Sequence, residues 1–142
     1  MYWQCYLRAG LVYVPTTGVT KHDLYRVIEP VSVVPASNLE GLRRAFAEAL
    51  TRGNPEVPAL KPSDYPPPVL PKYAGVKTWN SFARNASLWA ISERDGSYKI
   101  LGYRRQAANG WVQDKKQEVI FPSGTTIDQV IDRMIATLQN PS

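Results

Sequence analysis

The stretch that decides the fold is Ser87–Arg104, which reads SLWAISERDGSYKILGYR. Two runs rich in aromatic and branched residues flank Asp95 and Gly96 near its centre. Asp-Gly between such runs is typical of a two-residue turn that joins antiparallel strands. Leu88 and Trp89 are neighbours and must point to opposite faces of a strand, so both faces carry apolar side chains. This pattern indicates a hairpin inside a sheet rather than at its edge.

Further strands are expected before this hairpin. Tyr2–Arg8 has the aromatic content of a strand, and a turn at Ala9 and Gly10 would pair it with Leu11–Val14. The next four residues, 15–18, read Pro-Thr-Thr-Gly and are expected to break the strand pattern.

Two other segments predict strands with interruptions. Tyr25–Val34 is rich in valine and isoleucine but contains Pro30, which cannot donate to a strand ladder. We therefore expect an edge strand there, or two short strands with a bend. After the hairpin, Trp111–Val112 and Glu118–Phe121 predict a further strand, or one strand with a charged bulge at residues 114–117.

Two long helices and one short helix are expected. Residues Asn38–Thr51 place apolar side chains at helical spacing, and Ser37 with Glu40 has the spacing of a capping box. Thr126–Gln139 has the cleanest amphipathic pattern of the chain, with apolar residues at i, i+3, i+4, i+7, i+8 and i+11. Val76–Ala86 predicts a short helix.

A proline-rich segment separates the two halves of the chain. Residues 54–71 contain seven of the twelve prolines, so they predict an extended connector. Together with the strands and helices, this indicates an α+β fold: a mostly antiparallel sheet of about five or six strands packed with two amphipathic helices. We expect a single domain spanning residues 1–142.

Composition narrows the class of protein. The 142 residues are 44% hydrophobic and 20% charged, which is ordinary for a globular protein. Cys5 is the lone cysteine and is expected to be a plain core thiol. No disulfide framework, signal peptide or apolar run of membrane-spanning length is recognisable, so a cytoplasmic location is expected.

Groups that carry out chemistry are sparse. His22 beside Asp23 is the one pairing that resembles a catalytic imidazole, and a hydrolase built on His22 is the weakest hypothesis, because adjacent residues rarely face each other productively. No metal-ligand spacing and no glycine-rich phosphate loop occur, so we expect no cofactor and no enzymatic activity.

Aromatic and basic residues lie next to each other in the second half, and the net charge is +5. Aromatic rings stack on bases while cations hold phosphates in proteins that bind single strands. An alternative function is therefore a single-stranded nucleic-acid-binding module using Tyr98, Tyr103, Arg104, Arg105 and Trp111. The competing interpretation is a sheet whose aromatics are core and whose cations are solvated.

The order of these features resembles a family of bacterial immunity proteins from contact-dependent growth inhibition systems. The similarity extends from about residue 27 to residue 138. The matching features are the strand with Pro30, the capped helix from Ser37, Tyr65-Pro66-Pro67-Pro68, Lys72-Tyr73-Ala74-Gly75, Trp79 with Phe82, the hairpin, Trp111, and Phe121-Pro122-Ser123-Gly124-Thr125 before a helix.

The resemblance implies a cytoplasmic protein without activity of its own. It implies that the partner is the C-terminal toxin domain delivered by a neighbouring cell, commonly a nuclease. One property departs from expectation, because inhibitors of basic nucleases are often acidic and this chain is basic. Either the toxin is acidic where it docks, or acidic residues cluster locally on this chain, or the resemblance misleads.

A contact surface is predicted from residue type. Interface hot spots favour Trp, Tyr and Arg. Such residues gather with lysines around the turn at residues 106–110, so we expect the partner to touch a group made of Tyr103, Arg104, Arg105, Trp111, Lys115 and Lys116. The competing interpretation is that Trp111 anchors the core and that the cations are merely solvated.

Overall fold

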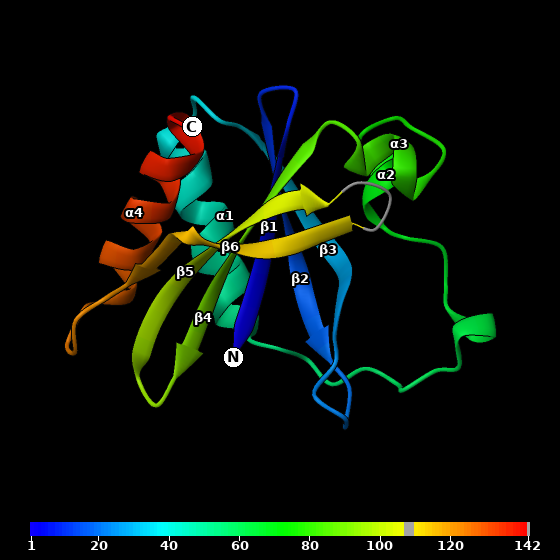
Figure 1. Ribbon diagram of the computed structural model, residues 1–142, viewed down its shortest axis with the longest axis horizontal. Helices are drawn as coiled ribbons and strands as arrows, with labels where there is room; N and C mark the ends of the chain where they lie inside the picture. The colour runs from blue at the N-terminus through cyan, green and yellow to red at the C-terminus, as the bar shows by residue number, and fades with distance from the viewer. Residues whose placement is uncertain (107–109, 142) are drawn as a thin grey trace.

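The computed structural model describes residues 1–106 and 110–141. Six antiparallel strands form one open sheet in the order β3-β2-β1-β4-β5-β6 (Figure 1). The α+β class and the antiparallel sheet expected from the sequence are confirmed. The strands are β1 (Tyr2–Arg8), β2 (Leu11–Val19), β3 (Tyr25–Pro35), β4 (Ala86–Arg94), β5 (Ser97–Gln106) and β6 (Gly110–Ile120).

The hairpin that dominates the sequence lies inside the sheet, as predicted. β4 pairs with β1 on one side and with β5 on the other. Arg94 stands opposite Ser97, so the loop is the two residues Asp95 and Gly96, with φ values of 52° and 80°. Positive φ at both positions is the geometry of a type I′ turn, which Asp-Gly favours.

The expected break after Val14 is wrong. β2 continues through residues 15–18 to Val19. The register shifts between Pro15 and Thr16, so the irregularity at this point is a bulge rather than an end of the strand. The Thr16 hydroxyl donates to the Pro30 carbonyl at 2.9 Å and helps to hold β3 across the shift. A bulge accommodates a proline that cannot donate to the ladder.

The two edge strands of the sheet are the two segments for which the sequence predicts interrupted strands. β3, which contains Pro30, is one edge strand, and β6 is the other. In β6 the pairing jumps from Asp114, opposite Gly102, to Val119, opposite Ile100. The sequence allowed either a further strand here or one strand with a charged bulge, and the single strand with a bulge is confirmed.

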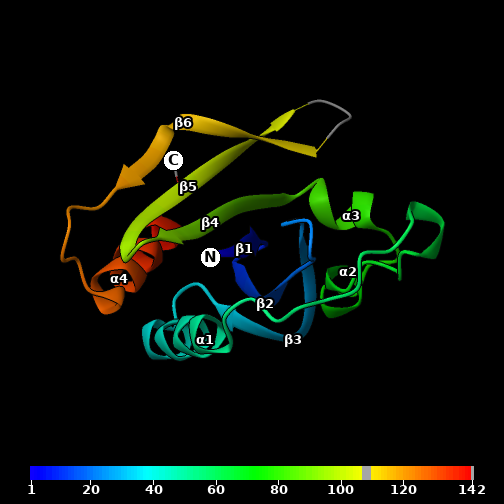
Figure 2. The same ribbon diagram turned by 90° about the horizontal axis from the view of Figure 1, so that it is seen from below.

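Two long helices cover one face of the sheet. α1 (Leu39–Arg52) and α4 (Ile127–Gln139) pack side by side against it (Figure 2). The core between them and the sheet includes Trp89, Ile91 and Met134. These helices match the predicted bounds within one residue.

The caps of the two helices differ from each other. Thr126 forms a full capping box with Gln129, as the sequence permits. The predicted box at Ser37 is wrong, because α1 is capped by Asn38, whose side chain accepts from the Gly41 N–H at 2.9 Å. With the cap moved one residue along, Glu40 pairs with Arg43 instead.

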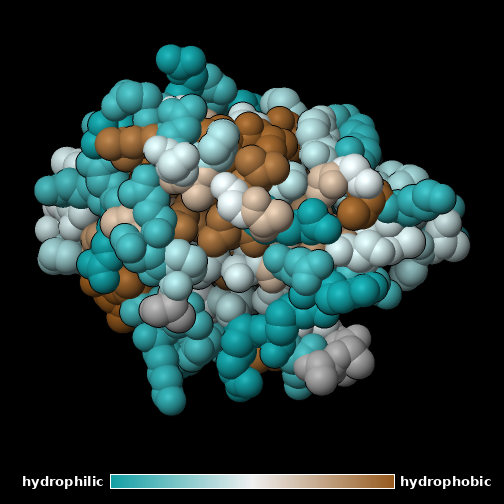
Figure 3. All heavy atoms as spheres, turned by 90° about the horizontal axis from the view of Figure 1, so that it is seen from above, coloured by the Kyte–Doolittle hydropathy of each residue, from teal (hydrophilic) through white to brown (hydrophobic). Residues whose placement is uncertain are grey.

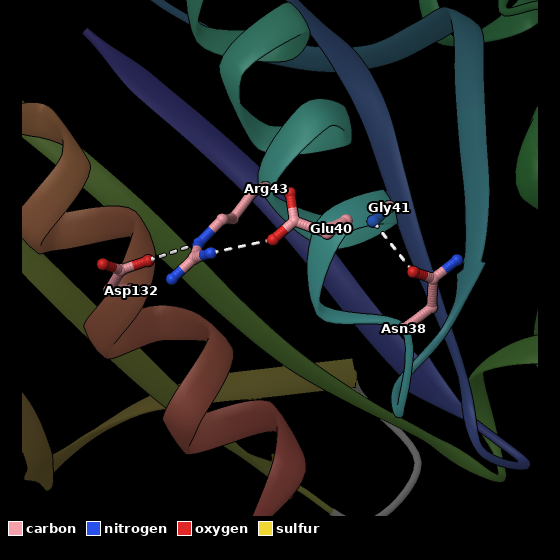
Figure 4. Close-up of polar contacts among 5 residues, drawn as sticks. All are labelled: Asn38, Glu40, Gly41, Arg43 and Asp132. Atoms are coloured by element: carbon pink, nitrogen blue, oxygen red, sulfur yellow. Dashed lines mark hydrogen bonds and ion pairs between the residues drawn. The ribbon is translucent and has the colours of Figure 1, made fainter.

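Arg43 joins the two long helices at their surface. Its guanidinium lies 3.0 Å from Glu40 on α1 and 3.1 Å from Asp132 on α4 (Figure 4). Both carboxylates are solvent-exposed, and such pairs contribute only about 0–1 kcal/mol each. The buried apolar faces therefore hold the helices together, and Arg43 adds a bridge at the surface between them.

The opposite face of the sheet is covered only at one end. There, α2 (Leu70–Tyr73) and α3 (Trp79–Ala83) pack over a second cluster of buried residues. The expected helix over Val76–Ala86 is shorter than predicted, because Thr78 caps α3 and β4 already begins at Ala86. The connector before α2 holds one short helical turn, η1 (Pro62–Asp64). No helix within the described residues reaches the length and apolarity of a membrane span.

Candidate partner-binding surface

A groove runs between β3 and the proline-rich connector. It has a cavity volume of about 730 Å³. One wall is residues 24–28, which lead into and form the start of β3, and the other is residues 58–61 and 65–69 of the connector, with Trp79 of α3 also lining it. We call it the β3–connector groove. The two walls lie far apart in sequence and come together because the connector passes beside β2 and β3.

The connector is held in place by backbone and side-chain bonds. Val19 donates to the Pro55 carbonyl and accepts from the Val57 N–H, both at 2.9 Å. Arg26 in β3 donates to the Pro58 carbonyl at 3.1 Å. A β-carbon on Gly18 would lie 2.6 Å from the Val57 side chain, so the close approach of the connector requires glycine at this position. These contacts hold the connector beside β2 and β3 and so define the groove.

Large apolar side chains are exposed along this groove. Leu24 is 61% exposed, Tyr25 is 42% exposed and Tyr65 is 56% exposed, and all three line it. Isolated exposed apolar residues need no explanation, but a group of them around one concave site is typical of an interaction surface.

Apolar surface also occurs elsewhere on the molecule. On the face shown in Figure 3, apolar patches cross the middle of the surface and hydrophilic side chains surround them. Apolarity alone therefore does not distinguish the β3–connector groove. Its distinguishing property is the combination of enclosure, exposed aromatics and cationic side chains.

An aromatic cluster joins the groove to the opposite edge of the sheet along one face. Trp79 lies 5.6 Å from Phe82, 6.0 Å from Tyr6 and 5.9 Å from Trp111, measured between ring centroids. Arg105 stands over the Trp111 ring at 5.1 Å. The cluster thus leads from the groove to the end of β5 and β6.

The six residues predicted as a contact surface lie on β5 and β6, and we call them the β5–β6 edge. The structure does not bring them together on one face. Tyr103 and Arg105 share a face with Trp111, which stands opposite Arg105 in the ladder. Arg104 alternates to the other face of the sheet. There, hydrogen bonds from the Gln117 side chain and the Lys116 backbone lower the pKa of Asp114, and the charge of Arg104 adds a smaller effect.

The two aromatics of the β5–β6 edge are engaged within the fold. The Tyr103 hydroxyl forms a 2.9 Å hydrogen bond with the hydroxyl of Tyr2. Trp111 is partly buried and packs against the second core cluster. Arg104, Arg105, Lys115 and Lys116 are exposed. This edge therefore presents mainly cations. Residues 107–109 of the predicted surrounding turn lie outside the described residues.

The alternative nucleic-acid surface is divided in the same way. Tyr98 packs against the core beneath α1 and α4. Tyr103 and Trp111 belong to the opposite face. The three rings therefore do not form one continuous platform on which successive bases could stack.

The reactive residues singled out in the sequence, His22 and Cys5, lie in different environments. His22 is exposed and lines the groove, with its backbone N–H donating to the Thr20 hydroxyl at 3.2 Å. Cys5 is buried, with 1% exposure, and desolvation raises the pKa of its thiol. Across residues 1–106 and 110–141, no group of three His, Cys, Asp or Glu side chains is placed to hold a metal ion.

The sequence favours the β5–β6 edge as the contact surface, with the proline-rich connector or the loop around His22 as the next choice, and residues of both of these segments line the groove. The groove arises from two segments some thirty residues apart, so no single local pattern shows it. The available signals were the proline-rich connector with Tyr65 and the polar loop around His22.

Solved structures with the same fold are known. A protein of unknown function from Neisseria meningitidis matches with a TM-score of 0.67 and 16% identity, over 96% of this chain and 92% of that one. A chain of the CdiA-CT/CdiI toxin and immunity complex from Yersinia pseudotuberculosis matches with a TM-score of 0.63 and 12% identity, over 96% of this chain and 95% of that one. This chain therefore shares its fold with a chain of that complex. No protein-family model and no curated protein sequence matches the chain.

Proposed function

We propose that this protein is an immunity protein that binds and neutralises the toxin domain of a contact-dependent growth inhibition system. The observation that carries the proposal is the shared fold, over nearly the whole chain, with a chain of a toxin and immunity complex. The sequence resemblance points to the immunity component of such systems. Two lines of reasoning, one from sequence features and one from backbone topology, therefore lead to the same class of protein.

The surface is consistent with a protein that acts by binding. Its concave site is lined by exposed aromatic and aliphatic side chains and by cations. His22 lines that site as an exposed side chain, and within the described part of the chain no group of three His, Cys, Asp or Glu side chains is placed to hold a metal ion. Such a site favours docking of a macromolecule over chemistry on a small molecule.

The finer features of the function are also proposals. The toxin is proposed to be a nuclease, and neutralisation is proposed to take place in the cytoplasm, where the toxin would meet its substrate. The β5–β6 edge is proposed to take part in the contact through its cations, because complementary charge speeds encounter between partners.

The experiment first searches upstream of the gene for a large exported protein that ends in a toxin domain, and then titrates this protein with that domain. We expect a one-to-one complex with a Kd in the nanomolar range or tighter. Generic single-stranded RNA is the second probe. The nucleic-acid alternative predicts RNA affinity that falls steeply with salt. Strong salt-dependent RNA binding without toxin binding would reject the immunity function.

A further inference from the structure

We propose that the β3–connector groove is the main docking site for the toxin, and that its occupant is an acidic segment carrying apolar side chains. The inference rests on the proposed immunity function and adds the place and the chemistry of the contact. It differs from the surface expected from sequence, which lies on the β5–β6 edge. Four properties of the groove support the inference: its shape, its exposed apolar side chains, its charge and the prolines in its connector wall.

The size of the groove fits side chains of a docked segment. Its cavity of about 730 Å³ lies within the range of roughly 300–1,000 Å³ that is usual for ligand sites. The walls are two extended segments held together at their base by the Arg26 bond to Pro58. An elongated occupant that follows β3 fits such a space better than a compact small molecule.

The exposed side chains of the groove define the apolar part of the occupant. Leu24 and Tyr25 stand on the β3 side, and Tyr65 stands on the connector side. Tyrosine supplies a large apolar contact area at low cost in side-chain entropy, and it is enriched at interface hot spots. Apolar side chains on the partner would cover these three residues from solvent.

The charge of the groove defines the acidic part. Its lining contains the cations Arg26 and Lys61, and none of the described lining residues is Asp or Glu. Arg26 donates to one backbone carbonyl, and its buried Nε has no hydrogen-bond partner. No ion pair involving Arg26 or Lys61 forms within the described ranges. A carboxylate on the partner would supply the missing counter-charge.

The connector wall favours recognition through side chains. Pro58, Pro66, Pro67 and Pro68 line it, and proline has no backbone N–H to donate. An occupant therefore gains little from backbone pairing with that wall. Apolar contact and charge complementarity are the interactions that remain.

The test measures the affinity and association rate of the full-length protein for the toxin domain encoded upstream. Two variants alter opposite features of the groove: Tyr65→Ala removes an exposed ring, and Lys61→Glu reverses a charge. The matched controls are Ile120→Ala and Lys99→Glu, which face each other across β5 and β6 outside the groove. All four side chains are exposed, so thermal unfolding is expected to stay unchanged.

The expected result is a loss of affinity of about tenfold or more for each groove variant, with Lys61→Glu acting mainly by slowing association. Each control is expected to stay within about twofold of the original protein. Groove variants that bind as tightly as the controls would overturn the groove as docking site while leaving the immunity function intact. Absence of toxin binding by the unaltered protein would instead overturn the immunity function, and the groove proposal with it.

Discussion

Trp79 in α3 and Trp111 in β6 lie edge to face, with ring centroids 5.9 Å apart and planes at 73°. Trp79 lines the β3–connector groove, and Trp111 lies beneath Arg105 on the β5–β6 edge. The groove and one side of the β5–β6 edge are therefore neighbours on the same face of the sheet. A partner seated in the groove could reach Arg105 but would meet the sheet between itself and Arg104.

This arrangement predicts unequal effects of two adjacent arginines. The double variant Arg104→Glu/Arg105→Glu is expected to weaken toxin binding by more than ~2 kcal/mol, with thermal stability nearly unchanged. Most of the loss is expected from Arg105→Glu, because Arg105 shares a face with Trp111 and Arg104 does not. Calorimetric titration of the two single variants checks this. Equal losses would show that the partner covers both faces of the strand pair.

Phe82 is predicted to hold the aromatic cluster together. Its side chain is fully buried, and its ring contacts those of Tyr6, Tyr13 and Trp79. Phe82→Ala is expected to lower the free energy of unfolding by about 3–5 kcal/mol, since it removes a large ring and leaves a cavity. The control Leu39→Ala alters an exposed side chain and is expected to change it by about 0.5 kcal/mol or less. Urea unfolding measures both, and a similar small effect for Phe82→Ala would contradict this role.

Cys5 is predicted to be unreactive in the folded protein. Its thiol is buried beside Met134, with the two sulfur atoms 4.0 Å apart, and desolvation raises the thiol pKa. Because the thiolate is the reactive form, labelling by an aromatic disulfide reagent is expected to be slow in buffer and fast in urea. Rapid stoichiometric labelling under native conditions would show that the core beneath α4 opens readily.

Glu29 is predicted to make stability sensitive to acid. The hydroxyl of Tyr73 and, next in importance, the ammonium of Lys72 hydrogen-bond its carboxylate and lower its pKa. A carboxylate with a lowered folded-state pKa contributes stability above its unfolded pKa, and loses that contribution as pH falls through the folded value. Glu29→Gln should therefore lose less stability than the original protein between neutral pH and about pH 3.

Urea unfolding of both proteins at the two pH values measures the Glu29 effect. The contact is exposed, so the expected difference is small but has a definite sign. An acid-induced loss that is equal in both proteins would show that other carboxylates account for it.

The elements with strong local signals were predictable from the sequence. The Asp95-Gly96 turn has one favoured geometry, and the apolar stripe of residues 127–138 has one buried face. Pro15 was expected to end the strand, because proline usually does so. In the structure the register shifts between Pro15 and Thr16, and the strand continues past the proline. Whether a proline ends a strand or sits in a bulge depends on the neighbouring strand, which local sequence does not specify.

The contact surface was less predictable because it depends on strand ends and on chain path. The expected strand stopped at Arg104, but β5 continues to Gln106, and this extension places Arg104 and Arg105 on opposite faces. The groove depends on the path of residues 55–69 beside β2 and β3, and that path is set by contacts between distant residues such as Gly18 and Val57.

Growth protection is the decisive measurement of the proposed immunity function. Bacteria carrying an inducible copy of the upstream-encoded toxin domain would be grown with this protein, with an unrelated immunity protein, or with neither. Cells are expected to resume normal growth only with this protein, and the protein is expected to give no protection against an unrelated toxin. Growth arrest by the cognate toxin despite abundant, folded protein would contradict the immunity function.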